Sequence, residues 1–350
     1  MNQDKLNALV VEVPEGGSPI LVQKTVPVPC LGSNQVLVKV STVAQNPTDV
    51  QAFDTNVFGD GAVLGCDFAG TVEVVGSSVG QVSKGDTIAG LIWGGEIKGL
   101  GAYSDYTIAD ERICFKVPEK ISLAEAATIP LASLTSFLAL FSNDSLRIDR
   151  NSGSDTTILI WGGSSSVGSY AVQIAALHGF KIVTTCSPRH FELVRSLGAD
   201  HAFDYRSPDV VELIKTAAPG LQYVFDTIGN ETSSVLGSQA ISEHGGTLCT
   251  VRPGKANTEN VTKQTKVTDV LVWTSFLKEH RYREFHWPAN EGDHKLASEF
   301  CELLPALIEG GRIKPNAVRL LPGGLGAVAE GFQEHRDGKI SATKIVYELS

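Results

Sequence analysis

Basic residues are in deficit in this 350-residue sequence: 29 lysines and arginines stand against 39 acidic residues, a net charge of −10 at pH 7. Because there is no basic run, we expect no nucleic-acid partner. The N-terminus lacks a basic segment followed by an apolar one, and no apolar stretch is expected to reach the length of a membrane span. Both absences favour a cytoplasmic protein without a membrane partner. At this length, 42% hydrophobic residues suffice for two packed domains.

None of the six cysteines belongs to a Cys-x-x-Cys pair, and their wide scatter favours reduced thiols over a disulfide framework. One of them, Cys66, precedes Asp67 in the segment LGCDFAGTVEVVG (64–76). A thiol beside a carboxylate suggests half of a metal site. Zinc, however, needs three or four convergent ligands, and these two residues alone do not supply them. The sequence also has no low-complexity segment.

The secondary-structure pattern divides the chain into a β-rich first third and an α/β region. Short apolar or alternating runs broken by glycine, proline and asparagine predict strands up to about residue 120. A capping box of Ser122 and Glu125 then predicts the start of an apolar helix, expected over Ala124–Phe141. From residue 156 to 251, buried strands alternate with helices over short links, which predicts a doubly wound parallel sheet. Residues 252–288 show no clear pattern.

A glycine-rich turn lies between the first buried strand of this region and the helix after it. Gly162, Gly163 and Gly168 form an imperfect G-x-G-x-x-G with Ser165 at its centre. At a strand-to-helix junction, such backbone can hold a pyrophosphate on the helix N-terminus. A glycine cluster in an α/β protein can also be only a structural turn. Its context favours nucleotide binding.

The second strand of this region ends without the acidic residue that commonly binds the ribose hydroxyls of NAD. Ser187, Arg189 and His190 stand there instead and offer a hydroxyl and cationic groups to a 2′-phosphate. We therefore expect NADPH as the cofactor. The alternative is that Arg189 and His190 only cap an exposed helix start.

Taken together, these motifs resemble the medium-chain dehydrogenase/reductase superfamily over essentially the whole length. The segments that carry the resemblance are NPTD (46–49), GCDFAGTVEVVG (65–76), KGDTIAG (84–90), AATIPLASLTSFLAL (126–140), WGGSSSVG (161–168) and VFDTIG (224–229). The sequence is most similar to the fungal trans-acting enoyl reductases of polyketide biosynthesis and toxin-cluster oxidoreductases, with zinc-free quinone oxidoreductases next. The resemblance implies a Rossmann NADP-binding domain at 126–289 and a GroES-like catalytic domain at 1–125 and 290–350.

The resemblance also implies the site residues. Cofactor contacts are implied at Asn46, Pro47, Thr48, Asp49, Gly163, Ser164, Ser165, Ser166, Val167, Ser187, Pro188, Arg189, His190, Tyr205, Thr250, Val251, Val346 and Tyr347. Substrate contacts are implied at Leu131, Ala132, Ser133, Leu134, Thr135, Ser136, Phe137 and Leu138 and, by a looser alignment, at Val272 and Trp273. From their local sequence alone, the first four cofactor residues are an Asn-Pro turn, and Thr135 is a hydroxyl that bonds to a helix carbonyl.

Two departures from the family pattern matter. Zinc-dependent members have histidine and glutamate where this chain has Cys66 and Asp67, and cysteine near the position of Asn46, so no metal is expected. The polyketide enoyl reductases have a lysine at the position of Gln51, which puts acyl-carrier recognition in doubt.

The expected chemistry is conjugate reduction, with hydride passing from NADPH to the β-carbon of an α,β-unsaturated carbonyl. Thr135 or a backbone N–H would hold the carbonyl oxygen, and water would supply the proton. Three functions compete: an enoyl thioester reductase that serves a polyketide synthase, a quinone or small-enone reductase, and a non-catalytic NADPH-binding protein. The sequence leaves the oligomeric state open between monomer and homodimer.

Overall fold

The computed structural model describes residues 5–282 and 285–349, and these form two compact units. The first unit holds residues 5–131 and 301–349 together with Arg281, Tyr282, Phe285 and His286. The second holds Ala132–His280 and Trp287–Phe300. The division of function at residues 125 and 290 stays a prediction.

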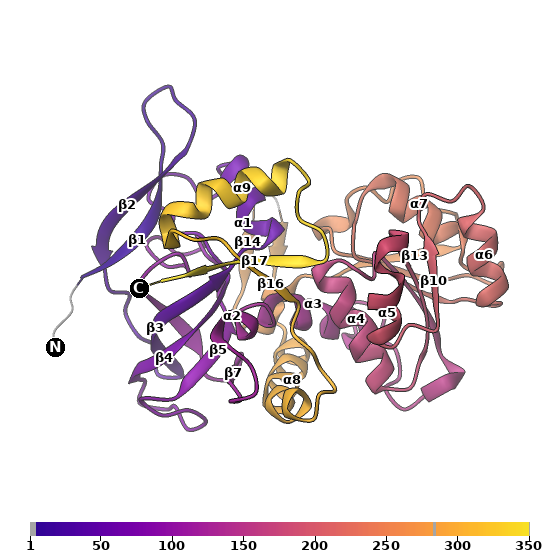
Figure 1. Ribbon diagram of the computed structural model, residues 1–350, viewed down its shortest axis with the longest axis horizontal. Helices are drawn as coiled ribbons and strands as arrows, with labels where there is room; N and C mark the ends of the chain where they lie inside the picture. The colour runs from indigo at the N-terminus through magenta and orange to yellow at the C-terminus, as the bar shows by residue number, and fades with distance from the viewer. Residues whose placement is uncertain (1–4, 283–284, 350) are drawn as a thin grey trace. The chain divides into compact units, whose positions relative to one another are not determined.

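The first unit is built on a mostly antiparallel sheet with the order β16-β17-β3-β4-β5-β7, and β6 pairs with β3 (Figure 1). The strands are β3 (Gln35–Ala44), β4 (Asp67–Val75), β5 (Thr87–Leu91), β6 (Tyr106–Asp110), β7 (Cys114–Lys116), β16 (Ala317–Leu320) and β17 (Thr343–Glu348). A separate antiparallel pair is formed by β1 (Lys5–Glu12) and β2 (Ile20–Pro27). Val38, Phe68, Ile88 and Tyr103 are fully buried between these strands and belong to one apolar core.

The helices α1 (Pro47–Asp54) and α9 (Val328–Arg336) belong to this unit. The 3-10 turn η5 (Gly324–Ala327) precedes α9. Phe332 of α9 joins the same apolar core and lies 5.7 Å, centroid to centroid, from the ring of Phe53 on α1. The C-terminal segment thus returns to complete the β-rich unit, with β17 antiparallel to β3.

The second unit is a six-stranded parallel sheet with the order β10-β9-β8-β11-β12-β13. Its strands are β8 (Thr157–Trp161), β9 (Lys181–Cys186), β10 (His201–Asp204), β11 (Tyr223–Asp226), β12 (Gly246–Thr250) and β13 (Thr265–Asp269). The helices α4 (Ser166–Leu177), α5 (Phe191–Ser196), α6 (Val210–Ala217) and α7 (Glu231–Gln239) pack on it (Figure 1). This strand order confirms the predicted doubly wound sheet. The strands are added toward one edge from β8 to β10 and toward the other edge from β11 to β13. Such folds bind ligands at the point where the order reverses, here between β8 and β11.

The strands of this sheet are apolar because both of their faces are covered. Leu159, Val183, Val224 and Leu248 come from four neighbouring strands and are no more than 1% exposed. Ile214 of α6 packs into the same cluster. The unit is completed by short 3-10 turns, η1 (Gly153–Asp155), η2 (Pro188–His190), η3 (Pro253–Lys255) and η4 (Val272–Ser275), and by the start of α8 (Glu291–Glu309).

Residues 252–288, which had no clear pattern in the sequence, contain β13, η3 and η4 and two short strands that pair with each other, β14 (His280–Tyr282) and β15 (Phe285–Trp287). Strand β13 is the edge strand, and its burial alternates weakly along TKVTD. A polar edge strand gives little apolar signal, which explains why it was missed.

The predicted single helix over Ala124–Phe141 was wrong. The chain forms α2 (Leu123–Ala126), an interruption, and then α3 (Pro130–Phe141). The residue before a proline is disfavoured in helical geometry, so Pro130 starts a new helix instead of continuing the old one. The capping box of Ser122 and Glu125 is confirmed: Ser122 Oγ accepts the Glu125 N–H at 3.2 Å.

The expectation that no stretch reaches membrane-spanning length was also wrong by the test of length and composition. Among the described residues one stretch passes that test, Leu123–Phe141, with a mean hydropathy of 1.5. Of the 18-residue window tested, 83% is buried inside the protein. This stretch therefore belongs to the protein core.

Candidate functional site

The glycine-rich turn of the second unit connects β8 to α4 as the sequence predicts. Gly162 has φ +87°, a left-handed conformation that favours glycine. A Cβ on Gly163 would lie 2.1 Å from Thr184 Oγ1, and one on Gly168 would lie 2.1 Å from the Gly162 carbonyl oxygen. The turn therefore packs against β9 and against the first turn of α4 too closely for any side chain. This is the close backbone approach that a pyrophosphate loop requires.

Ser165 is the N-cap of α4. Its Oγ accepts the Gly168 N–H at 2.9 Å and lies 2.9 Å from Thr227 Oγ1. The hydroxyl thus caps the helix and fixes the loop, while a role of the helix N-terminus in binding an anion stays a prediction. Ser164, Ser166 and Val167 are all partly exposed. A phosphate can therefore reach this part of the loop.

Helix α3 adjoins this loop within the second unit. Ser136 Oγ donates to the Val167 carbonyl oxygen at 2.8 Å and also lies 2.8 Å from the Ala132 carbonyl oxygen. The structure thus brings the predicted substrate segment next to the predicted pyrophosphate loop, a proximity that the sequence pattern did not contain.

Within α3, most of the predicted substrate residues form core. Phe137 is 3% exposed, and its ring stacks on Phe300 at a centroid distance of 4.4 Å. Ala132, Ser133, Leu134, Ser136 and Leu138 are no more than 1% exposed. Leu131 and Thr135 are the most accessible of the segment, at 8% and 7%, and their i, i+4 spacing places them on one face of the helix. That face is the most exposed part of the segment, although both side chains are buried.

The end of β9 has the predicted adenosine-side residues. Ser187 is the N-cap of η2, Pro188 and Arg189 are exposed, and His190 is half-buried. Arg189 Nε lies 3.2 Å from His190 Nε2. Partial burial, together with the Arg189 charge, lowers the pKa of His190. At neutral pH Arg189 is therefore the cationic group of this pair.

A second arginine near this point was missed from the sequence. Strand β10 is parallel to β9, with Asp204 in register with Cys186, and Tyr205 and Arg206 follow it. Arg206 pairs with Asp204 through two contacts, Nε to Oδ1 at 3.0 Å and Nη2 to Oδ2 at 3.1 Å. Its guanidinium carbon lies 5.4 Å from the centroid of the Tyr205 ring, which is 43% exposed. The arginine next to the predicted Tyr205 was the available signal.

Further predicted contacts lie at the same carboxyl edge of the parallel sheet, to the cofactor at Thr250 and Val251 and to the substrate at Val272 and Trp273. Thr250 ends β12 and is fully buried, and the Val251 N–H donates to the Asp226 carbonyl oxygen at 3.2 Å. Val272 and Trp273 lie in η4, which follows β13 by two residues, and are 7% and 4% exposed. The edge where open α/β sheets bind ligands therefore carries all of the predicted residues of this unit outside α3.

The first unit contains the NPTD segment at the start of α1. Pro47 is exposed, Thr48 is half-buried, and Asn46 and Asp49 are each 2% exposed. Asp49 Oδ2 accepts the backbone N–H of Asn46 at 2.7 Å and lies 3.4 Å from the Tyr103 hydroxyl. The local Asn-Pro turn is therefore real, and it is locked by its own aspartate.

Asp49 sits in an unusual electrostatic environment. Burial raises its pKa to about 6, although hydrogen bonds from the Cys66 thiol and the Asn46 N–H oppose the shift. Burial also raises the pKa of the Cys66 thiol, and the neighbouring carboxylates add to this rise. Cys66 is therefore an unreactive thiol and not a thiolate.

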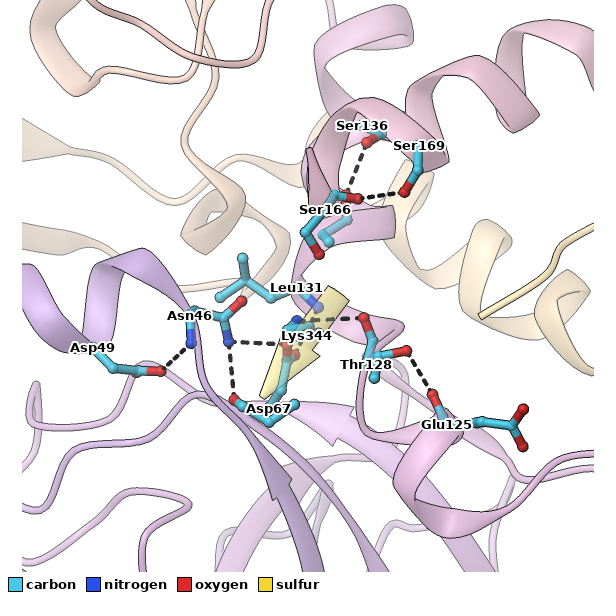
Figure 2. Close-up of polar contacts among 12 residues, drawn as sticks. Asn46, Asp49, Asp67, Glu125, Thr128, Leu131, Ser136, Ser166, Ser169 and Lys344 are labelled. Atoms are coloured by element: carbon cyan, nitrogen blue, oxygen red, sulfur yellow. Dashed lines mark hydrogen bonds and ion pairs between the residues drawn. The ribbon is translucent and has the colours of Figure 1, made fainter. Parts of the chain in front are cut away.

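A buried ion pair lies beside this turn. Lys344 Nζ of β17 contacts Asp67 Oδ2 at 2.5 Å, and their side chains are 3% and 0% exposed. The same carboxylate accepts the Asn46 side-chain amide at 3.0 Å and the Leu131 backbone N–H at 2.8 Å (Figure 2). Lys344 was not singled out from the sequence, although a lysine directly before the apolar run Ile345–Tyr347 was a usable signal.

Val346 and Tyr347, the predicted contacts of the closing strand, are both fully buried in the β-rich unit. The Tyr347 hydroxyl hydrogen-bonds to the Gln45 side chain, whose amide donates to the Gly331 carbonyl oxygen at 2.9 Å. The Tyr347 ring packs on Tyr103 with a centroid distance of 6.1 Å. A cofactor role for these two residues stays a prediction.

Comparison with known proteins agrees with this architecture. The Alcohol dehydrogenase GroES-like domain model matches residues 32–119, and the Zinc-binding dehydrogenase model matches residues 166–288. The fold is that of the medium-chain dehydrogenase/reductases, as the sequence predicts. Among solved structures, the CurK enoyl reductase matches with a TM-score of 0.76 at 20% identity, over 99% of this chain and 100% of the other.

Named relatives show to which family within this fold the chain belongs. The trans-enoyl reductase fsa3 of Fusarium sp. (strain FN080326) is 35% identical over 97% of this chain and 98% of its own length. The trans-enoyl reductase eqxC of Fusarium heterosporum is 35% identical over 96% of both chains. The chain belongs to the trans-enoyl reductase family.

The description of one matching domain names zinc, and the residues present do not fit that metal. The Asp67 carboxylate is already bound by the Lys344 ammonium and by the Asn46 amide N–H, and neither of these groups is a zinc ligand. Within residues 5–282 and 285–349, no group of three histidine, cysteine or acidic side chains is placed to hold a metal ion.

Proposed function

We propose that the protein reduces the C=C bond of an α,β-unsaturated carbonyl, an enoyl thioester or enone, with hydride from NADPH and without zinc. The observation that carries this proposal is the similarity to trans-enoyl reductases over nearly the whole chain. The tight glycine turn at the start of α4 supports it, because it is built for close approach of a dinucleotide.

The enzyme family uses a nicotinamide cofactor, and NADPH is our choice between the two forms. Its support is the absence of an acid at the end of β9, where Ser187 and Arg189 stand. Asp204, the nearest acid on the adjoining strand, is already neutralised by Arg206. This ion pair is largely exposed, and such surface pairs hold their partners weakly, so the Arg206 guanidinium can interact with a 2′-phosphate in addition to Asp204.

The protein's part in the chemistry is to bind, orient and exclude water. The nicotinamide supplies the hydride when bound. Ser164–Val167 and the α4 N-terminus would hold the pyrophosphate, and Asn46–Asp49 would contribute to binding the nicotinamide. Thr135 or a backbone N–H polarises the substrate carbonyl, and the apolar face of α3 around Leu131 receives the acyl chain. Water supplies the α-carbon proton.

For its partner, we propose an acyl chain that is either free as a thioester or held by a polyketide synthase in the cytoplasm. The relatives are named trans-enoyl reductases, and this supports an enoyl chain as the substrate. Gln51, where the polyketide reductases have lysine, is helical and exposed on α1. Carrier recognition through this position is therefore expected to differ from that of the relatives.

The test is turnover of purified protein with NADPH against matched panels of enoyl thioesters, small enones and quinones. Oxidation of NADPH with formation of the saturated thioester supports the proposal. Faster reduction of quinones than of every enoyl substrate would establish a quinone reductase instead. NADPH binding with no turnover of any acceptor would establish a non-catalytic nucleotide-binding protein.

A further inference from the structure

Asp67 is the centre of a buried polar cluster that ties several segments of the first unit together. It is the first residue of β4, and it contacts Asn46 before α1, Leu131 at the start of α3 and Lys344 of β17 (Figure 2). Lys344 also donates to the Thr128 carbonyl oxygen at 3.3 Å, in the interruption between α2 and α3. Three N–H donors thus converge on one carboxylate.

Burying the charged groups of this cluster costs free energy, so a contribution to stability alone does not account for the cluster. A buried carboxylate and ammonium lose their hydration, and an apolar pair of similar volume is commonly as stable or more so. Asp67 is fully buried, so its charge is compensated only by the donors around it. The arrangement makes sense where orientation is needed, because each donor has one fixed direction toward the carboxylate.

Asp67 orients two of the segments that the proposed function uses. The Asn46 side-chain amide is held at 3.0 Å from one carboxylate oxygen, and the backbone of Leu131 is held at 2.8 Å from the other. Asn46 begins the segment assigned to the nicotinamide, and Leu131 begins the α3 face assigned to the substrate. The carboxylate therefore sets the spacing of these two segments within the first unit.

We propose that Lys344 and Asp67 form a positioning device, in which the buried ammonium of Lys344 fixes the carboxylate that orients these two segments. Lys344 holds the Asp67 carboxylate in place, and Asp67 in turn aligns Asn46 and the start of α3. Neither residue takes part in the chemical step. This inference rests on the proposed function for its catalytic consequence, but the geometry it claims can be tested without turnover.

The experiment compares Lys344→Met, Asp67→Asn and the double variant with wild type. Lys339→Met is the matched control, since it removes a lysine from an exposed ion pair with Asp337. For each protein, kcat and KM are measured with an enoyl thioester, NADPH affinity by fluorescence titration, the unfolding midpoint by heating, and amide hydrogen exchange by mass spectrometry.

We expect each single variant to lower kcat at least tenfold while NADPH affinity changes less than threefold, because the adenosine and pyrophosphate contacts lie in the other unit. Hydrogen exchange should accelerate in residues 46–54 and 128–138 and stay unchanged in β8 and α4. The double variant leaves no unpaired buried charge, so its unfolding midpoint should recover toward that of wild type while its kcat stays low.

Recovery of kcat together with the midpoint in the double variant would overturn the proposal, because the pair would then be purely structural. Exchange that accelerates throughout the chain, or nowhere, would overturn it as well. If wild type reduces no enoyl substrate, the proposed function fails, and the exchange pattern still decides whether the cluster positions these two segments.

Discussion

Asp49 offers a quantitative test of the electrostatics at the start of α1. Its carboxylate is 2% exposed, and burial raises its pKa to about 6 from an ordinary value of 3.8. Because the folded state binds this proton more tightly than the unfolded state, folding is favoured at low pH. This favourable effect of the proton on folding is lost as the pH rises from about 4 to about 6. Above about pH 6 the free-energy cost of burying the ionised carboxylate is constant. With these two pKa values, the ionised group costs about 1.6 kcal/mol at pH 5 and about 3 kcal/mol at pH 8.

The substitution Asp49→Asn removes this pH-dependent cost and keeps an oxygen that can accept the Asn46 N–H. Urea unfolding of wild type and variant at pH 5 and pH 8 measures the effect. We expect the stability of the variant relative to wild type to increase by about 1.4 kcal/mol between the two pH values, the difference of the two costs. Glu15→Gln, at an exposed position of the same unit, is the control and should show no such change. A difference between variant and wild type that is equal at both pH values would refute a raised pKa for Asp49.

Three further predictions concern cofactor, metal and substrate. Replacing Arg189 and Arg206 by glutamine should weaken NADPH by about ten- to a hundredfold and NADH little, because a charge-assisted phosphate contact is worth about 1.5–3 kcal/mol; equal losses by titration would contradict the 2′-phosphate assignment. The purified protein should contain no stoichiometric zinc and should keep its activity with a chelator, and about one zinc per chain by elemental analysis would disprove this. Efficiency on enoyl thioesters should rise with chain length until the pocket is full, by about 0.8 kcal/mol for each buried methylene. Thr135→Leu should abolish turnover and leave NADPH affinity nearly unchanged; a Thr135→Leu enzyme with normal kcat would remove this residue from the site.

Local sequence was sufficient wherever a segment's own pattern determines its structure. The strand TILIW is apolar throughout because both faces of a parallel strand are covered, and Gly162 marks the turn after it because its φ is positive. Both features operate within a few residues. The glycine turn and the parallel sheet could therefore be predicted from local sequence, whereas carboxyl-edge residues such as Tyr205, Thr250 and Val251 were predicted only from the family resemblance.

The parts that could not be predicted depend on contacts between distant residues. Lys344 and Asp67 are 277 positions apart, and nothing near either residue indicates its partner. Phe137 was predicted as a substrate residue from the family resemblance of its segment, yet the structure stacks it on Phe300. An apolar helix shows that its side chains are buried, but only the packed fold decides which of them face the core and which remain for a ligand.

The opening of α3 shows how the two kinds of information combine. Pro130 divides the apolar stretch, so the backbone N–H of Leu131 lies in the first turn of a new helix, where no carbonyl of that helix can accept it. Asp67 accepts it from a separate strand. A carboxylate at a helix N-terminus is also favoured by the helix dipole. The break before Pro130, which was not predicted from the sequence, thus creates the helix N-terminus whose N–H group Asp67 accepts. Because of this break, the carboxylate that is not a zinc ligand in this chain has a structural partner.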